Sequence, residues 1–157
     1  MVFNSAYTLA GGGNTLTLSN STITANTTAT ISAVLGGSTG LIKDGTGTLT
    51  LSGTNTYTGT TTISNGVLNV TTLANGGSNS NIGASSNDAA NLVLNGGTLR
   101  YSVGAAAAVS TDRLFSVGTS GGIIDASGGF NIIFTNTGSM YKTRLKSAAG
   151  APGGVVV

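Results

Sequence analysis

The sequence of 157 residues contains no cysteine, histidine, glutamate or tryptophan, and it has a single proline. Without cysteine the chain has no disulfide framework, no thiol nucleophile and no thiolate metal site. Without histidine and glutamate, the four aspartates are the only side-chain carboxylates available for acid–base chemistry or metal binding. We therefore predict that the chain is not an enzyme and has no catalytic, cofactor-binding or metal-ligating residues. Its carboxylates are Asp44, Asp88, Asp112 and Asp125.

Charge is also scarce, since charged residues make up 6% of the chain against about 25% in ordinary globular proteins. The net charge of +2 is too small to indicate a nucleic-acid partner. No stretch approaches the ~20 apolar residues that span a bilayer, so we expect no membrane insertion by this segment. The Met1–Asn4 start has neither a basic region nor an apolar run, so an export signal is not expected within the chain.

Small polar residues dominate what is present: Gly, Thr, Ser and Asn together make up 85 of the 157 residues. Hydrophobic residues still reach 39%, and they alternate with polar ones, as in Thr48–Leu51, which is typical of half-buried strands. No segment has a helical period, so the chain is predicted to be all-β and folded. The strand candidates are 15–19, 28–34, 40–43, 48–52, 60–64, 67–70, 91–94, 98–101, 114–117, 122–125 and 131–134.

Turn dipeptides separate these strands, and they include three Asn-Gly pairs at 65–66, 75–76 and 95–96. The stretch at 14–32 also resembles the stretch at 47–64, at offsets of 33 and 32. Such an echo favours a solenoid, because each coil meets the same structural demand. Coils of ~20–25 residues, with rungs ~4.8 Å apart, predict roughly six or seven rungs of a β-solenoid. We expect one solenoid domain over residues 1–149.

Residues 40–73, GLIKDGTGTLTLSGTNTYTGTTTISNGVLNVTTL, resemble the autotransporter passenger-associated β-strand repeat. The resemblance implies a right-handed parallel β-helix that is exported to the bacterial cell surface or beyond, with no catalytic residues. The positions that carry it are Leu41, Lys43, Gly45, Gly47, Thr48, Leu49, Leu51, Ser52, Gly53, Asn55, Tyr57, Gly59, Thr62, Ile63, Gly66 and Leu68.

Three features suggest activities beyond a plain scaffold. Asp112 and Asp125 are spaced to lie on successive coils, with Arg113 nearby. One interpretation is a sparse site that cleaves polysaccharide. The alternative is that Asp112 pairs locally with Arg113 and that Asp125 caps a turn. The alternating triplet Lys142, Arg144 and Lys146 suits either an anionic partner or a solvated strand that discourages edge pairing. Threonine rows suggest ice binding, although their spacing is irregular.

The chain's two ends suggest assembly. Residues 150–157 read as a Gly/Pro hinge followed by a docking strand that adds to a neighbouring copy, and the strand consists of Val155, Val156 and Val157. Val2 and Phe3 lie in an uncharged N-terminal stretch and are the other candidate contacts. The predicted partners are therefore further copies of the chain, joined end to end, or neighbouring repeats of a longer chain, with surface glycans as a third class.

The sequence thus predicts a non-catalytic structural module of a bacterial extracellular or cell-surface fibre or adhesin. The alternative is a glycan-binding or ice-binding module of a longer autotransporter-type passenger. The residues expected to form most of the inward stack are Leu49, Leu51, Ile63, Leu68, Val70, Leu92, Leu94, Leu99, Ile123 and Ile132.

Overall fold

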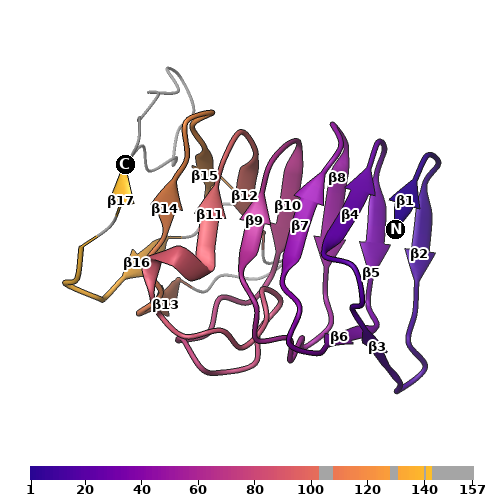
Figure 1. Cartoon of the computed structure of the whole chain (residues 1–157), viewed down its shortest axis with the longest axis horizontal. Helices are drawn as coiled ribbons and strands as arrows, with labels where there is room; N and C mark the ends of the chain where they lie inside the picture. The colour runs from indigo at the N-terminus through magenta and orange to yellow at the C-terminus, as the bar shows by residue number, and fades with distance from the viewer. Residues whose placement is uncertain (103–107, 128–130, 140, 143–157) are drawn as a thin grey trace.

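The computed structural model of the chain is a β-solenoid built from parallel strands (Figure 1). It describes residues 1–102, 108–127, 131–139 and 141–142. One sheet holds seven strands in the order β1 (Val2–Phe3), β4 (Thr22–Ala25), β7 (Leu41–Asp44), β9 (Thr61–Ile63), β11 (Leu92–Leu94), β14 (Ser116–Val117) and β17 (Tyr141–Lys142). Each strand pairs with one from the next coil, so the sheet runs along the long axis of the molecule.

The second sheet holds six strands in the order β2 (Tyr7–Leu9), β5 (Ala29–Ile31), β8 (Thr48–Leu51), β10 (Val67–Val70), β12 (Thr98–Tyr101) and β15 (Ile123–Asp125). A third face carries two short pairs, β3 (Thr15–Thr17) with β6 (Val34–Gly36), and β13 (Val109–Thr111) with β16 (Ile132–Phe134). The 3₁₀ turn η1 (Ala89–Asn91) is the only helical element in the described part of the chain. The prediction of an all-β solenoid of six or seven rungs is confirmed.

Register fixes the length of each coil. Leu41 pairs with Thr61, 20 residues further on, and Ala29 pairs with Leu49 at the same distance. One coil is longer, because Thr61 pairs with Leu92, 31 residues on. The additional residues lie between β10 and β11, in segment 71–91, which we call the insert.

The echo between 14–32 and 47–64 is not the period of the coils. Thr15 lies in β3 and pairs with Val34, whereas its counterpart Thr48 lies in β8 on a different face. The two stretches look alike because every face requires the same alternation of inward apolar and outward polar side chains. The echo therefore indicates the repeated alternation of a solenoid correctly, but the residues it matches lie on different faces and are not register partners.

Inward side chains stack from coil to coil to form the core. Leu49, Leu68 and Leu99 share one register position and are fully buried. All but one of the ten predicted core residues are buried. Ile123 is the exception, with 46% of its surface exposed, because Ile124 pairs with Leu99 and takes the inward position. Because two isoleucines are adjacent in segment 121–125, the alternating pattern is satisfied with either of them facing inward. The prediction that Ile123 faces inward is wrong.

Several strands are shorter or more numerous than predicted. The candidate at 28–34 contains all of β5 and the first residue of β6, separated by a corner at Ser32–Ala33. The strands β1, β2, β4 and β13 are absent from the predicted candidates; each is two to four residues long, which is too short to give a clear periodic signal.

Candidate functional site

The outer surface of the six-stranded sheet is a ladder of polar side chains. The outward row at its centre runs through Thr8, Thr30, Thr50, Asn69, Arg100 and Asp125, one from each coil. Arg100 and Asp125 form an ion pair across neighbouring strands, with the Arg100 Nε 2.8 Å from Oδ2 of Asp125. This face is therefore largely neutral and rich in hydroxyl groups.

Outward Thr-x-Thr pairs occur on two adjacent coils of this sheet, and a single threonine, Thr8, continues the row on the first coil. Thr30 pairs with Thr50, and the preceding outward positions hold Thr28 and Thr48. The next coil replaces the pair by Val67 and Asn69, and the following coils carry charge. On the third face, Thr15 and Thr17 pair with Val34 and Gly36. The six-stranded sheet and the β3–β6 pair thus do not carry a Thr-x-Thr pair on every coil.

Three of the four aspartate side chains accept hydrogen bonds, each in a different part of the structure. Asp88 caps the short turn η1 by accepting a hydrogen bond from Ala90 N. Asp112 accepts hydrogen bonds from Gly76 N at 2.7 Å and from the side chain of Asn87 at 3.1 Å. Within the described residues, no group of three acidic or histidine side chains is placed to hold a metal ion.

Asp125 pairs with Arg100 and also accepts a hydrogen bond from Ser127 N. Burial raises its pKa, but the hydrogen bonds from Ser127 and Arg100 outweigh this and hold the pKa below its usual value. The predicted turn cap at Asp125 is therefore present. The predicted local pairing of Asp112 with Arg113 is wrong, because Arg113 turns into the interior and binds main-chain carbonyl groups instead.

The insert covers the third face between its two strand pairs (Figure 1). Its buried anchor on one side is Asn81, whose Oδ1 accepts hydrogen bonds from Thr71 N and Thr72 N and whose amide donates to Gly53 O. Asn55 completes the contact by accepting from Leu35 N and donating to Asn81 O. These amide contacts reinforce the main-chain hydrogen bonds that continue the third face here, from Asn55 N to Ser80 O and from Thr56 N to Leu35 O.

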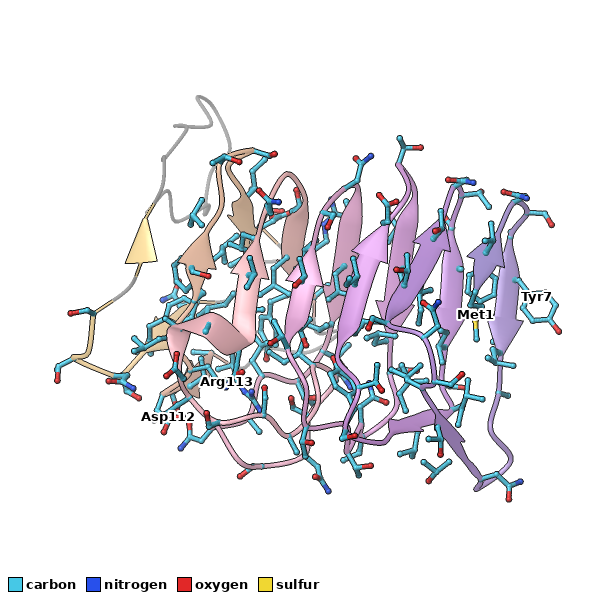
Figure 2. All side chains as sticks on the ribbon, viewed as in Figure 1. Met1, Tyr7, Asp112 and Arg113 are labelled. Carbon is cyan, nitrogen blue, oxygen red and sulfur yellow. The ribbon has the colours of Figure 1, made fainter. Side chains whose placement is uncertain are left out.

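Arg113 anchors the other side of the insert and is only 2% exposed. Figure 2 shows it within the lower part of the solenoid, close to Asp112. Its guanidinium donates to carbonyl oxygens of Ala74 at 2.8 Å, Gly83 at 2.9 Å and Ser85 at 3.0 Å. Further bonds reach Ser85 Oγ and the carbonyl groups of Asn75 and Ser78. Arg113 is a planar donor with five N–H groups, and here the folded insert surrounds it with acceptors.

Tyr57 lies under the same segment and is fully buried. Its hydroxyl hydrogen-bonds Thr61 Oγ1 at 2.8 Å, and burial raises its pKa. A β-carbon on Gly83 would lie 2.7 Å from the Tyr57 ring, so the insert can approach the ring only with glycine at this position. No buried side-chain nitrogen or oxygen among the described residues lacks a hydrogen-bond partner.

Lys43 is the second buried cation, and its exposed fraction is 0%. It occupies an inward position of β7, two residues after Leu41, between Ile23 and Ile63 of the neighbouring coils. Its Nζ donates to the carbonyl oxygens of Asp44 at 2.9 Å, Gly45 at 2.8 Å and Asn65 at 3.1 Å. The ammonium therefore ties together the corners of two coils.

Burial lowers the pKa of Lys43 to about 8, and the neighbouring Asp44 opposes this shift only in part. Between about pH 8 and the ordinary lysine pKa, the unfolded chain binds a proton that the folded chain has released. The free energy of unfolding should therefore rise as pH increases from about 8 to about 10, by at most about 1.4 kcal/mol per pH unit. Above about pH 10, Tyr57 reverses the trend because it ionises only in the unfolded chain.

Urea unfolding at intervals between pH 7 and pH 11 measures both the rise and the later decline. The variant Lys43→Met should lose the rise while keeping the decline at higher pH. A rise of the same size in Lys43→Met would assign the titration to another group.

The predicted site residues of the C-terminal region lie mostly beyond what the structure describes. Lys142 lies in β17, in parallel register with Val117 of β14. The other members of the basic triplet and the whole proposed docking strand lie outside the described residues; they are Arg144, Lys146, Val155, Val156 and Val157. The predicted roles of these five residues therefore stay predictions.

The two predicted contacts at the N-terminal end differ in exposure. Val2 is 61% exposed, whereas Phe3 is 8% exposed and stacks on Tyr7. Of the pair, only Val2 presents its side chain at the surface.

The first coil also exposes Tyr7, at 58%, and Met1, at 44%. Tyr7 occupies the inward register position above Ala29, and Figure 2 shows its ring pointing away from the end of the rod. A separate hollow of about 180 Å³ lies at the end of β2, lined mostly by apolar groups from residues such as Leu9, Leu16 and Ala33. Apolar side chains therefore concentrate at this end of the ladder.

In the described part of the chain, no helix has the length and hydrophobicity needed to cross a bilayer.

Comparison with known proteins agrees with the sequence resemblance. Residues 41–70 match the family model of the passenger-associated-transport-repeat. The chain is also 45% identical over 134 residues to the adhesin BmaC autotransporter of Brucella suis biovar 1 (strain 1330). The match covers 84% of this chain and 4% of that relative, so the chain spans a small part of the relative's length. No solved structure matched.

Proposed function

We propose that this β-solenoid, which carries a passenger-associated-transport repeat, is a non-catalytic structural module of a bacterial extracellular or cell-surface adhesin. The observation that carries the proposal is the unbroken register from coil to coil, with every inward polar group of the described residues satisfied. Such a stack of coils forms a regular rod with a long, largely neutral surface. The similarity to an autotransporter adhesin supports the extracellular setting.

The absence of clustered ionisable groups on the described surface favours a structural role over an enzymatic one. The two charged groups in the outward row of the six-stranded sheet form an ion pair with one another, and both buried cations bind main-chain carbonyl oxygens. A surface made of threonine, asparagine and serine forms many weak hydrogen bonds. It therefore suits broad adhesion to hydroxylated surfaces more than tight recognition of one ligand.

We further propose that the first coil is an end-to-end contact between coils, either with another copy of this chain or with a neighbouring repeat. Three features support this. The outer edges of β1 and β2 end their sheets, and Val2 and Tyr7 expose apolar surface. A mostly apolar hollow also lies on this coil, at the end of β2. An unpaired strand edge is a template for another strand. Residues 150–157 remain the proposed docking strand on the opposite side of that contact.

Sedimentation velocity over a wide concentration range tests self-assembly. The full chain should form oligomers whose size grows with concentration. Tyr7→Lys should lower the association constant at least tenfold, because it places a charge in the contact. Thr8→Lys is the matched control: it adds the same charge on the same strand but on the outer face. Deleting residues 150–157 should weaken assembly as well.

A full chain that stays monomeric at every concentration would contradict self-assembly and leave the longer polypeptide as the setting of the module. Equal loss of assembly in Tyr7→Lys and Thr8→Lys would show that net charge, and not the coil end, controls association.

A further inference from the structure

The chain has three Asn-Gly pairs, and their environments differ. Gly76 N donates to Asp112 Oδ1 at 2.7 Å, and Asn75 Oδ1 accepts from Asp112 N at 3.0 Å. Both halves of this pair are therefore engaged with another segment. The pair at 95–96 is held in the same way: Gly96 N donates to Gly121 O at 2.6 Å, and Asn95 Oδ1 accepts from Ser120 N at 3.2 Å.

At the third pair the two reacting groups face one another. Gly66 N donates to Oδ1 of Asn65, the residue before it, at 2.8 Å. This bond holds the glycine nitrogen beside the side-chain amide carbon to which it would bond in forming a five-membered succinimide. Asn65 is exposed to solvent, so water can reach the amide, and Gly66 (φ 61°) has no side chain to hinder ring closure.

Lys43 adds a chemical reason for reactivity at this pair. Its Nζ donates to Asn65 O at 3.1 Å, and that oxygen belongs to the same peptide group as the Gly66 N–H. When the N–H loses its proton, the negative charge is shared with this carbonyl oxygen. A neighbouring ammonium stabilises that charge. A β-carbon on Gly66 would lie 2.9 Å from the same Nζ, so the cation lies directly against this turn.

We propose that Asn65–Gly66 is a self-modifying site at which the Lys43 ammonium promotes conversion of the asparagine to a carboxylate. Gly66 N gives its proton to solvent and bonds to Cγ of Asn65. The bond from Cγ to Nδ2 breaks, and the nitrogen leaves as ammonia after taking a proton from water. One water molecule then opens the succinimide at either carbonyl, which yields aspartate or isoaspartate.

The product places a negative charge next to a buried cation whose other partners are neutral carbonyl groups. A repeat surface with few charges thus gains one at a defined corner as the protein ages. The predicted consequence is site-selective: residue 65 changes, whereas Asn75 and Asn95 keep their amides.

Peptide mapping by mass spectrometry, after incubating the folded chain at pH 7.5 and 37 °C, tests the proposal. Residue 65 should convert at least tenfold faster than residues 75 and 95. In concentrated urea the three pairs should convert at similar rates, because the differences in environment are gone. Comparable conversion of all three pairs in the folded chain, or conversion at residue 65 slower than in urea, would overturn the proposal.

The variant Lys43→Met isolates the role of the cation and should slow conversion at residue 65 to no more than the rate in urea. Circular dichroism establishes whether this variant is folded. If it is not, the comparison between the folded and urea-unfolded wild type still decides, because both use the natural chain. An undiminished rate in folded Lys43→Met would remove Lys43 from the proposal.

Discussion

Replacing Leu68 by aspartate is expected to lower the free energy of unfolding by at least about 4 kcal/mol, which is a large share of the ~5–15 kcal/mol that stabilises a typical domain. Leu68 is fully buried at the centre of β10, between Leu49 and Leu99 of the neighbouring coils. An aspartate there either buries an unpaired charge or takes up a proton at a cost. Urea unfolding followed by circular dichroism measures the loss.

Val67→Asp is the matched control for this substitution. Val67 precedes Leu68 on the same strand, but it faces outward between Thr48 and Thr98. The same added charge at this outward position should therefore cost about 1 kcal/mol or less. Equal losses in the two variants would mean that β10 does not present Leu68 to a closed interior.

Replacing Arg113 by methionine should release the insert and cost about 3–5 kcal/mol. The substitution removes six side-chain hydrogen bonds to segment 74–85. It leaves buried carbonyl groups without donors, because methionine keeps the volume but not the N–H groups. Limited proteolysis should show new cleavage within 71–91, at protease concentrations that leave the wild type intact.

Arg100→Met serves as the control because Arg100 is a surface residue whose side chain is 42% exposed and pairs with a single carboxylate. Exposed ion pairs contribute about 0–1 kcal/mol, so this variant should resist proteolysis as the wild type does. Cleavage within the insert of Arg100→Met, or an insert of Arg113→Met that stays protected, would contradict the anchoring role.

Alternation along the strands made most of the core predictable from the sequence. Leu49 and Leu51 lie two residues apart and face the same interior, as a period of two requires. The same rule applied to Leu41 would have placed Lys43 inside, since the two residues share a face. We did not predict this, because a lysine is ordinarily solvated and its acceptors come from corners that are remote in sequence.

The insert could not be predicted, because its stability depends on contacts from separate parts of the chain. Arg113 reaches back about 28 to 39 residues to its carbonyl acceptors, and Asn55 meets Asn81 across a distance of 26 residues. Neither contact leaves a periodic signal. Asp112 and Arg113, being adjacent and opposite in charge, looked like a local pair, but side chains next to one another on an extended segment point in opposite directions.

Engineered disulfides test the central claim, the register of the coils, most directly, because the natural chain contains no cysteine. Thr30 and Thr50 are register partners on adjacent coils, about 4.8 Å apart and within the range that a disulfide spans. Asn69 and Arg100 are partners across the coil that carries the insert. Both double-cysteine variants should oxidise quantitatively in the folded state. The variant pairing Thr30→Cys with Asn69→Cys, two coils apart at about 10 Å, should not. Efficient bridging between positions 30 and 69, or none between 69 and 100, would contradict the solenoid described here.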